Sequence, residues 1–102
     1  MLTEANIDHL KCKIAQLHDL HNKMQVGDDV FVIEECGELA KELMKCHRAK
    51  GSKEHVVEEA CDVLTTVLTL LYGLDVRDTV IANEINLKVN RAVDRYMTTG
   101  EK

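Results

Sequence analysis

The sequence contains no proline and no tryptophan, and it has only five glycines, two tyrosines and one phenylalanine. Without proline, nothing interrupts the backbone hydrogen-bond ladder of a long helix. Glycine, the next least favourable residue in a helix interior, is also scarce. The composition therefore favours long helices over a loop-rich or disordered chain.

The chain also lacks an excess of basic charge. Its 13 Lys and Arg residues are outnumbered by 18 Asp and Glu residues, and the formal net charge is −5. A nucleic-acid-binding protein usually carries a basic stripe, so no nucleic-acid partner is expected. An acidic protein still binds an anionic substrate when divalent cations reverse the local field.

Long hydrophobic runs are absent as well. The longest, residues 63–71, is interrupted by three threonines and is too short to span a bilayer. The N-terminal stretch carries Asp8 and has no apolar run typical of a signal peptide. The four cysteines contain no CxxC pair, which indicates reduced thiols. We therefore expect a cytoplasmic protein with no membrane partner. For the cysteines and histidines, a zinc site that uses Cys46 and His47, or His18 and His21, is a less favoured interpretation than reduced thiols and polar side chains.

Apolar residues recur at helical spacing in four segments, residues 6–24, 30–48, 52–72 and 76–96. Gly27 and Gly73 are expected to stop helices, and Ser52 and Asp75 to cap the next ones. Short connections favour antiparallel neighbours. The sequence thus predicts one all-α domain over residues 1–102, built as a four-helix bundle or a pair of helical hairpins, with residues 98–102 frayed.

Two features predict contacts with other molecules. Residues 63–71 are apolar nearly all round a helix, which indicates burial on every side. In so short a chain this favours burial against another subunit. Gly37 lies in a helix interior, where glycine costs about 1 kcal/mol relative to alanine, and it therefore predicts close approach of another helix or a ligand.

Two acidic clusters carry the candidate chemistry. Glu34, Glu35 and Glu38 lie in the second segment, and Glu59 and Asp62 lie in the third. Glu35 and Glu38, like Glu59 and Asp62, are three residues apart and share a helix face. Both pairs adjoin apolar sequence, where like charges are costly unless a cation neutralises them.

Oxygen-only ligation suits a hard cation, Mg²⁺ or alternatively Mn²⁺. The competing interpretation of either pair alone is an ordinary charged helix surface. The presence of a second pair on the neighbouring helix favours the metal site. A di-iron bundle is disfavoured, because that class uses Glu-x-x-His pairs and no glutamate here has a histidine three residues later.

The last segment adds Asn86, Lys88 and Arg91. Lysine and arginine bind phosphate oxygens. Taken alone, these cations are equally typical of a solvated face near a helix C-terminus. His18 and His21, also three residues apart, are interpreted as a polar helix face.

The motif of Glu34, Glu35 and Glu38 followed by Glu59 and Asp62 resembles the EExxE…ExxD signature of the all-α NTP pyrophosphatases. That superfamily includes MazG, dimeric dUTPases and dCTP pyrophosphatases. Residues 35–43 (ECGELAKEL) and 58–64 (EEACDVL) are closest to the MazG and dCTP pyrophosphatase form, and residues 86–91 (NLKVNR) resemble the NxKxxR segment of MazG.

The resemblance implies an oligomeric MazG-like fold, a homodimer or homotetramer, that hydrolyses the α–β phosphate bond of a nucleoside triphosphate. It implies Mg²⁺ held by Glu35, Glu38, Glu59 and Asp62. Catalytic roles would fall to Glu34, as base or orienting group, and to Glu38. Phosphates would be held at the last segment by Asn86, Lys88 and Arg91. The alternative is a non-catalytic helical module that binds metal or another protein.

Overall fold

The computed structural model describes residues 3–99, which form four helices and no strand. The predicted all-α class is confirmed. The helices are α1 (Glu4–Met24), α2 (Asp28–His47), α3 (Lys53–Gly73) and α4 (Asp78–Thr99). The tail expected to be frayed lies mostly outside the described residues, but its first two positions continue α4.

Side-chain caps mark where two of the helices begin. The Thr3 hydroxyl accepts the Asn6 N–H, and the Ser52 hydroxyl accepts the His55 N–H, so the predicted Ser52 cap is confirmed. The expected stop at Gly27 is wrong. Gln25 takes the left-handed conformation that ends α1, with φ of 59°, and Gly27 is the extended N-cap of α2.

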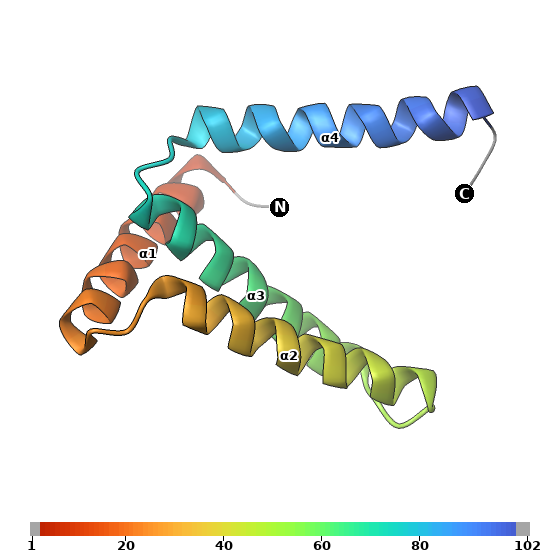
Figure 1. Ribbon diagram of the computed structural model, residues 1–102, viewed down its shortest axis with the longest axis horizontal. Coiled ribbons are helices and arrows are strands. Elements are labelled where there is room, and N and C mark those ends of the chain that lie inside the picture. The colour runs from red at the N-terminus through yellow and green to blue at the C-terminus, as the bar shows by residue number, and fades with distance from the viewer. Residues whose placement is uncertain (1–2, 100–102) are drawn as a thin grey trace.

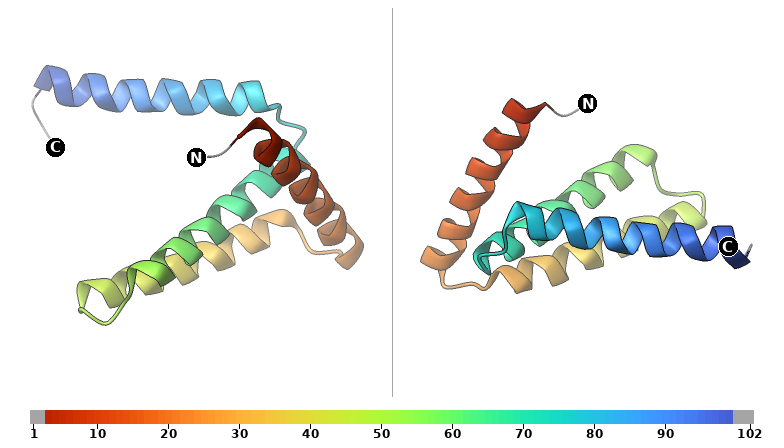
Figure 2. Two further views of the ribbon diagram at one scale, coloured as in Figure 1. Left: turned by 180° about the vertical axis from the view of Figure 1, so that it is seen from behind. Right: turned by 90° about the horizontal axis from the view of Figure 1, so that it is seen from above.

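The helices α2 and α3 run side by side as an antiparallel hairpin, and α1 packs across the end of α3 (Figure 1). Helix α4 leaves this unit at an angle and does not return to it, as the views in Figure 2 also show. In residues 3–99, α4 packs along none of the other three helices. One chain therefore contains a hairpin with two attached helices, and the predicted four-helix bundle is not closed within it.

Helix α4 is anchored at its first residue. Asp78 pairs with Lys11 of α1 and accepts a hydrogen bond of 2.8 Å from the Tyr72 hydroxyl of α3. Both bonds lower the pKa of Asp78 below its usual value, and the bond to Lys11 has the larger effect. The predicted cap at Asp75 is wrong, because Asp75 sits in the left-handed region with φ of 59° and the helix begins three residues later.

Three helices meet at Asp28. Its carboxylate oxygens lie within hydrogen-bond distance of the Nδ1 atoms of His18 and His21, at 2.6 and 2.7 Å. The His21 ring also stacks on Phe31, with ring centroids 4.1 Å apart. The predicted polar face is wrong for His21, which is buried. The two imidazoles therefore link α1 to α2 and have a structural role.

Gly73, the last residue of α3, completes this junction. A Cβ atom there would lie 2.6 Å from Asp28 Oδ2 and 2.6 Å from His18 Cε1, closer than real contacts allow. We expect Gly73→Ala to lower the free energy of unfolding by about 1–3 kcal/mol, as overpacking does. Urea unfolding measures this. Gly37→Ala is the control, because nothing lies within 4 Å of the position that its Cβ would take. We expect this control to be neutral or stabilising. An equal loss of unfolding free energy in both variants would contradict the close approach at Gly73.

The hydrophobic core of a single chain is very small. Ile14 is the one buried hydrophobic residue among those described, whereas Ile33, Leu64 and Met97 are 71%, 61% and 82% exposed. The Cα radius of gyration is 16.4 Å, against about 13 Å for a compact domain of this length. The accessible surface is 8258 Å², which exceeds by roughly 2,500 Å² the value of about 5,800 Å² expected for a folded monomer of this mass.

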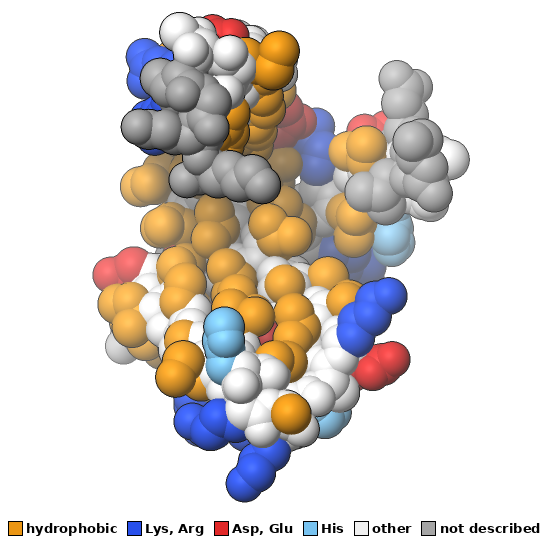
Figure 3. Space-filling model, turned by 90° about the vertical axis from the view of Figure 1, so that its right-hand side faces the viewer, with side chains coloured by type: hydrophobic (Ala, Val, Ile, Leu, Met, Phe, Trp, Pro, Cys, Tyr) orange, Lys and Arg blue, Asp and Glu red, His pale blue; other side chains and the backbone are white. Residues whose placement is uncertain are grey.

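The exposed apolar surface is concentrated between α4 and the hairpin of α2 and α3 (Figure 3). Figure 3 looks into the open side and shows hydrophobic side chains along the hairpin and along α4. Residues 63–71 are only partly covered within one chain: Thr66 and Thr69 are buried with their hydroxyls bonded to carbonyls of α3, but Leu64 is open. None of the described helices has the length and apolarity needed to cross a bilayer.

Candidate metal centre

Three carboxylates lie in a line along the face of α2 that packs against α3. Asp28, Glu35 and Glu42 are spaced by seven residues, which is close to two helical turns. Asp28 is held by two histidines, as described above. Glu42, which is 6% exposed, lies 3.3 Å from the Ser52 N–H and 3.8 Å from His55 Nδ1. Both ends of the line therefore have protein partners.

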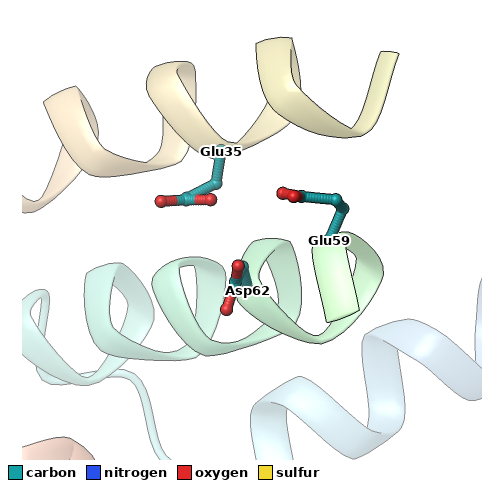
Figure 4. Close-up of side chains that lie close together, drawn as sticks. All are labelled: Glu35, Glu59 and Asp62. Atoms are coloured by element: carbon teal, nitrogen blue, oxygen red, sulfur yellow. The ribbon is translucent and has the colours of Figure 1, made fainter. Parts of the chain in front are cut away.

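The middle carboxylate has no such partner. Glu35 faces Glu59 and Asp62, which lie three residues apart on one face of α3 (Figure 4). One oxygen from each of the three carboxylates lies within 4.8 Å of the others. Among residues 3–99, no salt bridge neutralises any of them. This concentration of negative charge is what a cation would offset.

The electrostatics of Glu35 agree with this geometry. Partial burial is the largest cause that raises the pKa of Glu35, followed by the charges of Asp62 and Glu59 and then those of Glu34 and Glu38. Each cause disfavours the charged form of Glu35 when no cation is present. A divalent ion would reverse that preference.

The chemistry of the three side chains fits Mg²⁺ or Mn²⁺. All three offer carboxylate oxygens from two packed helices, and hard cations prefer oxygen ligands. Among the described residues, the close group contains neither cysteine nor histidine. The cysteines, expected to be reduced, are free thiols and all exposed. The zinc alternative gains no support, since His18 and His21 are committed to Asp28.

The structure does not bring every predicted ligand into this group. Glu38, one turn after Glu35, is exposed and outside the three-carboxylate cluster. Glu34 is exposed too. Both lie near enough for their charges to raise the pKa of Glu35. Both carboxylates are therefore open to solvent and close enough to the cluster to act on Glu35 electrostatically.

The predicted phosphate ligands are not next to the cluster in one chain. Asn86, Lys88 and Arg91 are exposed on α4, which stands away from the hairpin (Figure 1). Lys88 and Arg91, three residues apart, lie on one side of α4. Asn86 is two residues from Lys88, a spacing that points side chains in different directions. Asn86 therefore does not join the two cations on one surface of α4.

Two further carboxylates on this face of α2, Asp28 and Glu42, were not among the predicted site residues. The signal that would have found them is their seven-residue spacing from Glu35, which places all three on one helix face.

Comparison of the chain with protein-family models, curated proteins and solved structures finds no match. The likeness to the all-α NTP pyrophosphatases therefore stays a prediction from the acidic motifs. The geometry of Glu35, Glu59 and Asp62 is the structural feature that bears on function.

The raised pKa of Glu35 predicts how pH and Mg²⁺ act on stability. The pKa of Glu35 is higher in the folded protein than its ordinary value of 4.5 in an unfolded chain. Protonation of Glu35 therefore stabilises the fold fully below pH 4.5, and this contribution to stability is lost as the pH rises through the raised pKa. At neutral pH the charged cluster should instead be stabilised by Mg²⁺. Thermal unfolding with Mg²⁺ or EDTA should show a larger Mg²⁺-induced rise in Tm at pH 7.5 than at pH 5. A rise independent of pH would contradict binding at this cluster.

Proposed function

We propose that the protein is a Mg²⁺-dependent nucleoside triphosphate pyrophosphohydrolase, which cleaves the α–β phosphate bond to give a nucleoside monophosphate and pyrophosphate. The observation that carries the proposal is the cluster of Glu35, Glu59 and Asp62, three carboxylates without a cationic partner that converge from two packed helices, whereas Asp28 and Glu42 on the same face of α2 have protein partners. The acidic motifs add the likeness to the NTP pyrophosphatases.

Each residue at the centre has a role in this proposal. Glu35, Glu59 and Asp62 hold the metal, with Mn²⁺ as the alternative ion. The ion, when bound, neutralises the triphosphate and polarises the phosphorus under attack. Glu38 and Glu34, on the solvent side, orient the attacking water and accept its proton. Positioning and charge stabilisation supply most of the catalysis in phosphoryl transfer.

The proposal includes assembly with a second copy, as a homodimer or homotetramer. The surface excess of roughly 2,500 Å² per chain is larger than the about 800 Å² that each partner buries in a standard interface. The apolar side chains in the opening between α4 and the hairpin provide that interface (Figure 3). In this assembly, Lys88 and Arg91 are proposed to serve the phosphates of a site completed by the second copy.

Identification of the bond that is cut tests the proposed reaction. The purified chain is incubated with Mg²⁺ and dCTP or dUTP, and the products are separated by anion exchange. Monophosphate and pyrophosphate in equal amounts, lost on addition of EDTA, are expected. Diphosphate with orthophosphate would contradict the proposal, because it reports cleavage of the β–γ bond instead.

A second candidate is favoured by the exposed apolar surface, namely a non-catalytic helical module that keeps the metal site for its structure. This module would bind Mg²⁺ and self-associate, yet hydrolyse no nucleotide. Metal-binding calorimetry together with the product analysis separates the two functions.

A further inference from the structure

Glu42 is the most buried of the acidic side chains on α2, and the proposed chemistry does not use it. Its Oε2 atom accepts the Ser52 backbone N–H at 3.3 Å, and His55 Nδ1 lies 3.8 Å from Oε1. Burial of a carboxylate is costly unless its hydrogen bonds are made. An apolar residue at this position would leave the Ser52 N–H without this acceptor. The carboxylate therefore makes a directional contact that an apolar side chain does not replace.

The group that Glu42 binds marks the start of α3. Ser52 is the N-cap of that helix, and its hydroxyl accepts the His55 N–H at 3.2 Å. Gly51 lies tightly against the same carboxylate: a Cβ there would lie 2.7 Å from Glu42 Oε2 and 2.5 Å from Cys46 Sγ. The Glu42 carboxylate thus meets the start of α3 at the Ser52 N–H and at His55, and a side chain at Gly51 would collide with it.

This contact has a fixed relation to the metal centre. Glu42 lies seven residues after Glu35 on α2, and Ser52 lies seven residues before Glu59 on α3. Because the helices are antiparallel and rise by about 1.5 Å per residue, equal steps along both lead from one pair to the other. The contact between Glu42 and Ser52 therefore sets Glu35 and Glu59 opposite each other.

We infer that Glu42 is a positioning residue, a register latch that aligns α2 with α3 so that Glu35, Glu59 and Asp62 converge on one cation. This inference rests on the proposed metal-dependent function. Apolar side chains between two helices allow sliding by a turn, whereas a directional hydrogen bond specifies one register. A slip of four residues, about one turn, would place His55 or Val63 opposite Glu35 in place of Glu59.

Mn²⁺ binding, measured by calorimetry and by electron paramagnetic resonance, tests the latch without a nucleotide. Glu42→Leu removes the acceptor for the Ser52 N–H and is expected to weaken Mn²⁺ affinity by about tenfold, the factor equivalent to the net free energy of about one hydrogen bond. Glu42→Gln keeps a carbonyl acceptor and is expected to retain the affinity. Ile14→Ala, in α1, controls for loss of stability alone and should leave Mn²⁺ affinity unchanged in the folded protein.

The outcomes separate this inference from the proposed function. Absence of Mn²⁺ binding in the unsubstituted protein would overturn the metal site itself. Binding there and equally in Glu42→Leu would overturn the latch alone. An equal loss in Glu42→Gln and Glu42→Leu would also overturn it, because the charge and not the hydrogen bond would then matter. A loss of Mn²⁺ affinity in Ile14→Ala as large as that in Glu42→Leu would overturn it too, because general destabilisation would then explain both results.

Discussion

Replacement of Glu35 by glutamine is expected to reduce Mg²⁺-dependent pyrophosphate release by about a hundredfold or more, the scale of losing one group that stabilises developing charge. Glu35 is the α2 member of the three-carboxylate cluster and has no protein cation beside it. Glutamine keeps the shape of the side chain but removes one negative charge, so the remaining carboxylates hold Mg²⁺ less well.

The same substitution should stabilise the metal-free protein. The pKa of Glu35 is raised by burial and by its acidic neighbours, so its charged form destabilises the fold at neutral pH. A neutral amide removes that repulsion. We therefore expect Glu35→Gln to have a higher Tm in EDTA and a smaller Mg²⁺-induced rise. Loss of turnover in a folded, more stable variant cannot be attributed to unfolding.

Glu58→Gln is the matched control, since Glu58 precedes Glu59 on the same helix but is exposed and outside the cluster. It removes the same charge and should keep nearly full activity. Glu38→Gln is the informative comparison. Because Glu38 borders the cluster without joining it, its amide variant should lose turnover while keeping most of the Mn²⁺ affinity. Full activity in Glu35→Gln would contradict the assigned centre.

Substitution of Ile85 by glutamate is expected to dissociate the oligomer. Ile85 is 58% exposed on α4 in one chain, on the helix that packs along no other helix among residues 3–99. If a second copy covers it, an unpaired charge there costs about 3–5 kcal/mol of association, or roughly a hundredfold or more in the dissociation constant.

Sedimentation equilibrium measures the mass of each variant. The unsubstituted protein should sediment as a dimer or tetramer, and Ile85→Glu should shift toward the monomer with exposed apolar surface. Glu84→Gln, at the neighbouring position on α4, is the control and should keep the assembly. A monomeric unsubstituted protein would contradict the proposed second copy and would leave the apolar opening between α4 and the hairpin for another partner.

Helix positions were predictable from the sequence because they depend on local signals. The predicted bounds agree with the observed ones to within three residues. The Ser52 cap was found because a hydroxyl before a helical segment has a specific local partner. The start of α4 was misplaced because Asp78 is held by Lys11 and Tyr72, which are contacts from other helices.

The arrangement of α4 was not predictable, for a physical reason. Its periodic apolar residues indicate that one face is covered, yet periodicity does not say whether the cover comes from the same chain. The metal cluster was predictable in part. Glu59 and Asp62 share a helix face and meet Glu35 as expected. Glu38 has the same spacing from Glu35, yet it is exposed and lies outside the cluster, so spacing alone does not decide which acids converge.

The most direct test of the central claim is an assay of pyrophosphate release from a panel of eight NTPs and dNTPs with Mg²⁺, run in parallel on the unsubstituted protein, Glu35→Gln and Glu58→Gln. We expect Mg²⁺-dependent release from at least one nucleotide by the unsubstituted protein and by Glu58→Gln, with almost none from Glu35→Gln. No release from any nucleotide, or equal release by all three proteins, would contradict the central claim.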